Sequence, residues 1–144
     1  MKAGKLDEKT YLIRMERGED FMTSLKSFCH NHAIKNAFIS GIGSLSNPTV
    51  AHYDINAKEY KEKKLEGVFE LTSLIGNVAI CEQDIVIHCH VTLADANMQS
   101  FGGHLINGTI GATAELTVTV YPKHYDKTVD EATGVKLFDL PKED

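Results

Sequence analysis

The chain has 144 residues, of which 42% are hydrophobic and 24% are charged, so it can form one domain with a single core that needs no disulfide support. Fifteen lysines and arginines against 20 aspartates and glutamates give a formal net charge of −5, and only Arg14 and Arg17 are arginines. This composition excludes a disordered, collagen-like or coiled-coil chain. It also lacks the basic excess that is typical of strong nucleic-acid binders.

In chain order, the pattern of apolar residues first predicts a strand over 10–15, a helix over 19–33, a strand over 36–40, and an antiparallel pair over 49–54 and 59–65. The segment Gly41-Ile42-Gly43-Ser44 is expected to be the turn that ends the strand over 36–40. Residues 55–58 would join the antiparallel pair.

The second half is predicted to hold strands over 68–75, 78–82, 84–93, 103–106 and 112–121, and then a polar tail over 123–144 with a short apolar patch over 135–140. Gly76-Asn77 is a turn-type dipeptide and should break the first of these strands. Alternation is strongest over 84–93, where Cys89 faces one way and His88 and His90 face the other. One helix and many strands without regular alternation predict an α+β domain with a mainly antiparallel sheet.

The three cysteines have no C-x-x-C spacing, which argues against a disulfide framework and favours a reducing compartment. Residues 1–7 lack the apolar segment of a secretory signal, and no apolar run reaches the length of a membrane span. We therefore expect a cytoplasmic protein with no membrane association.

Three histidines form the most informative pattern. His88 and His90 are two positions apart on a predicted strand, so their imidazoles leave the same face. His104 follows Gly102 and Gly103 on what should be the neighbouring antiparallel strand, and these glycines would allow a close approach of backbone or ligand. Three converging imidazoles suit Zn²⁺ or another divalent transition metal, with nitrogens at about 2.0–2.1 Å and an open fourth position.

Other interpretations of these residues stay open. An H-x-H pair also occurs by chance, and histidines often serve as polar groups on a half-buried face. Glu70 is a candidate base for a metal-bound water, and its alternative role is that of a surface carboxylate. The chain has no G-x-S-x-G, dinucleotide-binding or Walker-type motif, so these routes to catalysis are not supported.

Several segments in fixed order carry a family resemblance: Gly41-Ile42-Gly43-Ser44, the run GVFELTSLIGN from Gly67 to Asn77, His88-Cys89-His90, Gly102-Gly103-His104-Leu105, and Gly108 to Val118. Together they resemble the PPC (plants and prokaryotes conserved) domain, of the type that stands alone in prokaryotes. The resemblance predicts an N-terminal extension over 1–10, a PPC-like domain over 11–140 and a C-terminal tail over 141–144.

The resemblance implies a single α+β domain with a mainly antiparallel sheet flanked by helices, assembly as a homotrimer, and a metal held by His88, His90 and His104. The family is described as DNA-binding largely through plant relatives, whose AT-hook contacts the minor groove. This chain has no Arg-Gly-Arg-Pro core, and Lys123-His124 stands where relatives often have an arginine. We therefore expect only weak DNA binding.

Three functions follow as hypotheses. The first is a zinc-binding homotrimeric module with a regulatory or assembly role. The second is a zinc-dependent enzyme that acts on a small anionic substrate through metal-bound water, with Glu70 as candidate base. The third is an interaction domain in which the histidines are structural. The open position of a three-histidine zinc site suits a small anionic ligand.

Overall fold

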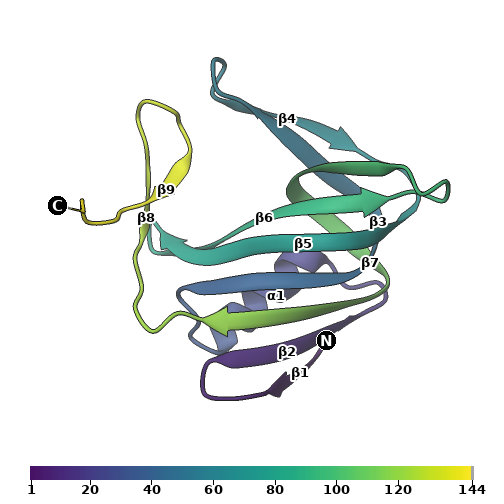
Figure 1. Cartoon of the computed structure of the whole chain (residues 1–144), viewed down its shortest axis with the longest axis horizontal. Helices are drawn as coiled ribbons and strands as arrows, with labels where there is room; N and C mark the ends of the chain where they lie inside the picture. Colours follow the sequence, from purple (N-terminus) through teal and green to yellow (C-terminus); the bar gives the residue numbers. More distant parts are fainter. Residues whose placement is uncertain (144) are drawn as a thin grey trace.

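The structure, a computed structural model, describes residues 1–143. Within them the chain forms one helix and nine strands (Figure 1). In chain order these are β1 (Lys2–Lys5), β2 (Thr10–Glu16), α1 (Phe21–Asn31), β3 (Ala37–Asp54), β4 (Glu59–Lys64), β5 (Val68–Cys81), β6 (Asp84–Ala94), β7 (Ser100–Val120), β8 (Lys127–Val129) and β9 (Lys136–Phe138). The predicted α+β class is confirmed, with one helix where the resemblance implied several.

All nine strands belong to one sheet, and every pairing is antiparallel except the contact of β5 with β8. The main path runs β1-β2-β7-β3-β5-β8-β9, with β4 beside β3. β6 pairs with β5 along its length and with the beginning of β7, which also pairs with β3. The sheet therefore curls until β3, β5, β6 and β7 close on one another, and this closure brings distant parts of the chain together.

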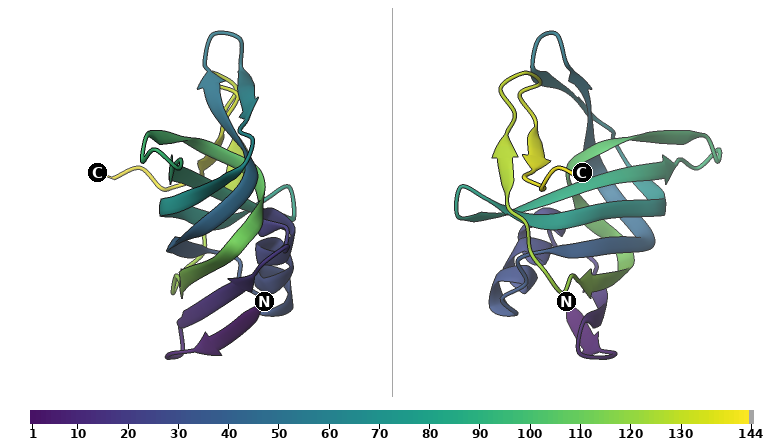
Figure 2. Two further views of the ribbon diagram at one scale, coloured as in Figure 1. Left: turned by 90° about the vertical axis from the view of Figure 1, so that its right-hand side faces the viewer. Right: turned by 60° about the vertical axis from the view of Figure 1, so that its left-hand side comes forward.

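Helix α1 lies on one side of the sheet (Figure 2). It begins after Asp20, whose side chain accepts a hydrogen bond from the Thr23 backbone N–H at 2.9 Å, an N-cap that satisfies one free donor of the first turn. Its buried face carries Phe21, Leu25, Phe28 and Cys29 at the predicted spacing. The core lies between this face and the inward side chains of the sheet. Within residues 1–143, the opposite face of the sheet carries no helix.

Two glycine segments that we predicted to be turns lie inside continuous strands. β3 runs through Gly41 to Ser44, where its register with β5 shifts in a β-bulge. A Cβ on Gly41 would lie 2.6 Å from the Glu115 carbonyl oxygen, so glycine lets β7 approach closely. β5 likewise continues through Gly76, whose absent Cβ leaves room for Cys89. In both places the glycine marks close strand packing.

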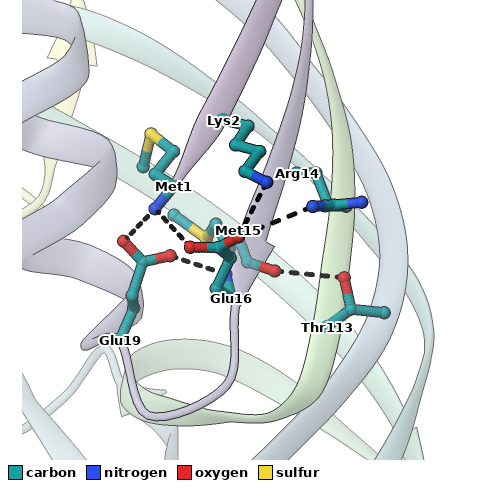
Figure 3. Close-up of polar contacts among 7 residues, drawn as sticks. All are labelled: Met1, Lys2, Arg14, Met15, Glu16, Glu19 and Thr113. Atoms are coloured by element: carbon teal, nitrogen blue, oxygen red, sulfur yellow. Dashed lines mark hydrogen bonds and ion pairs between the residues drawn. The ribbon is translucent and has the colours of Figure 1, made fainter.

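The first ten residues, which we expected to precede the domain, contribute β1 to the sheet. The Met1 ammonium donates to the Glu19 carboxylate at 2.6 Å, next to the first turn of α1 (Figure 3). The Glu16 carboxylate lies 3.7 Å from Lys2 Nζ and 3.5 Å from Arg14. These ion pairs connect the start of the chain to β2 and α1.

The segment after residue 122, which we predicted to be a polar tail with a short apolar patch, forms the hairpin of β8 and β9. The loop of this hairpin is attached to the hairpin of β3 and β4: Tyr53 Oη donates to the Thr133 carbonyl at 2.8 Å, and Lys58 Nζ to the Glu131 carbonyl at 2.6 Å. The two hairpins project side by side (Figure 2).

Within residues 1–143, no helix has both the length and the apolar character needed to cross a membrane.

Candidate metal centre

The three predicted ligands come together on the sheet face opposite α1. His88 and His90 leave β6 on that face, because the residues between and beyond them, Cys89 and Val91, are buried in the core. His104 on β7 is the direct cross-strand partner of His90. The pairing that the sequence could only suggest is thus present in the register of β6 with β7.

The ring nitrogens are close enough to share one ion. Nε2 of His88 lies 3.1 Å from Nε2 of His90, and one nitrogen from each of the three rings lies within 4.8 Å of the others. A tetrahedral zinc with Zn–N bonds of about 2.0–2.1 Å holds neighbouring nitrogens about 3.3 Å apart. The His88–His90 separation therefore matches the edge of such a site.

Burial favours the neutral, metal-binding form of two of the three rings, those of His88 and His104. It lowers the pKa of His88 to about 4, with smaller contributions from the positive charge of Lys127 and from the other two rings. Burial likewise lowers the pKa of His104. Among the described residues, the buried Nδ1 of His104 has no hydrogen-bond partner. Three converging imidazoles, one of them with an unsatisfied buried nitrogen, fit a divalent transition metal.

The glycines before His104 have the role that the sequence analysis gave them. A Cβ on Gly103 would lie 2.9 Å from the Ala51 carbonyl oxygen, and one on Gly102 would lie 3.1 Å from the Val91 carbonyl oxygen. A side chain at either position would push β3 or β6 away from β7. The pair therefore allows the strand packing that sets His104 opposite His90.

A cavity of about 760 Å³ lies over the histidines. Its lining comes from β3, β4, β5, β6, β7 and the C-terminal hairpin: Ala51, His52, Tyr53, Tyr60, Asn77, Val86, Ile87, His88, His90, Gly102, Gly103, His104, Lys127, Gly134, Val135, Lys136, Leu137 and Phe138. The Tyr60 ring lies 4.6 Å from the His104 ring, centroid to centroid, and forms one wall. The C-terminal hairpin forms another, so the histidines lie in a lined depression.

Lys127 is the main residue of this cavity that sequence reasoning missed. Only 4% of its surface is exposed, and its Nζ donates to Asn77 Oδ1 at 2.7 Å and lies 4.7 Å from the centre of the Phe138 ring. Asn77 is the cross-strand partner of His88, so the ammonium group is one side chain away from the histidines. Burial lowers the pKa of Lys127. The only signal in the sequence was the apolar patch that includes Phe138.

The structure does not bring Glu70 to the histidines within one chain. Glu70 is exposed, and its cross-strand partner on β6 is Ala94, four residues beyond His90. At about 3.3 Å per residue this is about 13 Å along the strand. Glu70 is also absent from the cavity lining among the described residues. It lies on the same face as the histidines, but at the other end of the strand pair.

Residues 3–122 match the family model of the Plants and Prokaryotes Conserved (PCC) domain. The fold is similar to a plant- and prokaryote-conserved protein of Pyrococcus horikoshii, with 33% identity, coverage of 99% of this chain and 96% of that one, and a TM-score of 0.87.

Two further solved structures are similar over almost their whole length. A presumed DNA-binding protein from Ralstonia eutropha JMP134 has 32% identity, 97% and 96% coverage and a TM-score of 0.89. A protein from Archaeoglobus fulgidus described as metal-containing has 29% identity, 95% and 94% coverage and a TM-score of 0.83.

Among curated proteins, the bifunctional protein GlmU of Synechococcus sp. JA-2-3B'a(2-13) is 31% identical over 129 residues, which are 88% of this chain. The chain spans about a fifth of the length of the curated relatives that it matches.

Proposed function

The chain belongs to the Plants and Prokaryotes Conserved domain family, as its sequence pattern predicted, and we propose that each chain binds one divalent metal ion, zinc, through His88, His90 and His104. The observation that carries the proposal is the convergence of the three rings, with one nitrogen from each within 4.8 Å of the others. The relative from A. fulgidus, described as metal-containing, supports it.

Zinc analysis of purified protein tests this proposal. We expect about one zinc per wild-type chain and a sharp loss in His88→Ala, His90→Ala and His104→Ala, because two imidazoles hold zinc poorly. His30→Ala is the matched control, since His30 is exposed at the end of α1 and lies outside the cavity. Equal zinc content in wild type and in the triple-alanine variant would refute the proposal.

The proposed unit is a homotrimer that assembles through the open face of the sheet. Large apolar side chains on this face are exposed: Leu12 (47%), Phe38 (38%), Ile42 (59%), Val68 (62%) and Ile75 (56%). Leu12 on β2 pairs with Thr117 on β7, Thr117 pairs with Ser40 on β3, and Ser40 pairs with Ile75 on β5. The patch therefore runs across four neighbouring strands. An exposed apolar patch of this kind is typical of an interface, and a heterologous interface that closes after three copies gives a ring.

A regulatory or assembly role of this trimer is the function that we propose, with only weak direct DNA contact. The presumed DNA-binding relative supports a role at DNA, whereas the net charge of −5 and the presence of only two arginines limit phosphate contacts. Gel-shift assays on a duplex rich in A·T pairs should show binding that disappears between about 50 and 200 mM salt. Nanomolar binding that resists salt would refute the weak-contact proposal.

The lined cavity favours a second candidate function, a zinc-dependent enzyme that acts on a small anionic molecule. The three histidines would hold the metal, which would supply Lewis-acid chemistry when bound. Turnover by the wild type that is lost in His88→Ala and kept in His30→Ala would support this candidate. Glu70 lies outside the cavity, and none of the described residues that line the cavity is a carboxylate that could act as the base. The zinc-binding module therefore remains the first proposal.

A further inference from the structure

The cavity over the histidines differs in charge from the chain around it. The chain has five more acidic than basic residues, yet none of the 18 described residues that line the cavity is an aspartate or a glutamate. The lining contains two lysines, Lys127 and Lys136, and four histidines. A divalent ion on three neutral imidazoles would add two further positive charges. The cavity is therefore suited to an anion.

Lys127 is the cation best placed to meet that anion. Its polar contact is the neutral amide of Asn77, and the Phe138 ring lies over its ammonium group. Among the ion pairs of residues 1–143, none involves Lys127. A buried ammonium without a counter-charge is costly, and a bound carboxylate would supply both the charge and a further hydrogen-bond acceptor.

The walls of the cavity indicate what the anion is attached to. Val86 and Ile87 of β6, Tyr60 of β4, and Val135 and Phe138 of the C-terminal hairpin give the lining an apolar part. A cavity of about 760 Å³ is also much larger than a simple inorganic ion or acetate requires. Apolar walls beside a cationic end fit a molecule that has one charged group and a hydrocarbon body.

We propose that Lys127 binds the carboxylate group of a small organic acid whose hydrocarbon body packs against Tyr60, Val86 and Phe138. The proposal rests on the metal-binding function above and deepens it, because the acid would lie beside the three histidines. Lys127 reaches the cavity from β8, and the side chains of Tyr53 and Lys58 hold the loop of the same hairpin by donating hydrogen bonds to its backbone carbonyls. The C-terminal hairpin thus contributes both the cation and one apolar wall.

Isothermal titration calorimetry on zinc-loaded protein tests this role. Hexanoate has the proposed charge and body, hexanamide has the same body without the charge, and acetate has the charge without the body. We expect the wild type to bind hexanoate more tightly than either of the other two. Lys127→Met should weaken hexanoate binding about 10- to 100-fold, the effect of losing one charge-assisted hydrogen bond, and leave hexanamide binding unchanged.

Two further variants complete the design. Lys123→Met is the matched control, because Lys123 is exposed in the same C-terminal segment and lies outside the cavity, and it should bind hexanoate as the wild type does. Lys127→Gln keeps a polar group that can contact Asn77, so it serves if the methionine variant fails to fold.

The outcomes separate the two proposals. Zinc analysis of the same samples decides the metal site, and wild type without zinc would overturn that function. If a zinc-loaded Lys127 variant binds hexanoate as tightly as the wild type, the anion-binding role of Lys127 is overturned. Equal affinity of the wild type for acetate, inorganic phosphate and hexanoate would overturn the organic-acid ligand.

Discussion

Replacing Gly76 by alanine is expected to be one of the most damaging single changes in the protein. Gly76 lies in the middle of β5 and is the cross-strand partner of Cys89, which stands between the two histidines of β6. A Cβ at this position would lie 2.7 Å from the Cys89 Sγ and 2.9 Å from its Cα, and closer still to the His88 carbonyl oxygen. Because two of these atoms belong to the backbone, they cannot turn away, and β5 and β6 must separate.

The change in the free energy of unfolding caused by Gly76→Ala is the sum of opposing contributions. Overpacking in a well-packed region costs about 1–3 kcal/mol. Each strand-pairing hydrogen bond that lengthens costs up to about 1 kcal/mol more. Alanine is favoured over glycine by about 0.5–1 kcal/mol through the entropy of the unfolded chain. The loss should therefore exceed the gain, and we expect the free energy of unfolding to fall by about 2–3 kcal/mol.

Urea unfolding followed by far-ultraviolet circular dichroism measures this change, at one fixed protein concentration because the protein is proposed to be a trimer. Gly4→Ala is the matched control, since a Cβ on Gly4 has no atom within 4 Å, and its effect should stay within about 0.5 kcal/mol. We also expect Gly76→Ala to reduce zinc content, because the clash lies between His88 and His90. If Gly76→Ala unfolds at the same urea concentration as Gly4→Ala, the close packing of β5 on β6 is refuted.

Three further predictions follow from the fold. Burial raises the pKa of Asp20, but hydrogen bonds from Thr23 and Asn107 outweigh burial and lower this pKa below its usual value of 3.8. The ionised Asp20 carboxylate therefore stabilises the fold. This stabilisation is complete above pH 3.8 and is lost as the pH falls through the lowered pKa. Asp20→Ala should cost about 1 kcal/mol at pH 7, and chemical unfolding should show this difference from wild type shrinking below about pH 4. Leu93→Ala, at a fully buried site, should cost about 2–5 kcal/mol by the same assay, and a cost below 1 kcal/mol would contradict its place in the core. Ile75→Glu should give monomers in light scattering with an unchanged dichroism spectrum, whereas an intact trimer would show that the open sheet face is not the interface.

Local sequence pattern was sufficient for the elements whose two faces differ in polarity. Alternation over 84–93 predicted the strand, placed Cys89 in the core and put His88 and His90 together on the other face, as observed. The helix was predictable for the same reason, because one of its faces is apolar, although its first residue depended on the cap at Asp20. Two side chains that are two positions apart on a strand point to the same face of the sheet, whichever strands lie beside it.

Tertiary structure alone decided what glycine and lysine do in this chain. We predicted Gly76 and Gly41 to be turn residues because glycine tolerates turn geometry. In the structure, the missing Cβ of each glycine lets a neighbouring strand approach closely, and the sequence does not show which strand lies next to a glycine. We predicted Lys127 to lie in a polar tail because lysine is seldom buried. Only the pairing of β8 with β5 places its ammonium group beside Asn77. The separation of Glu70 from the histidines likewise depends on the register of β5 with β6. Register and long-range pairing arise from the packing of the whole sheet, so no local pattern specifies them.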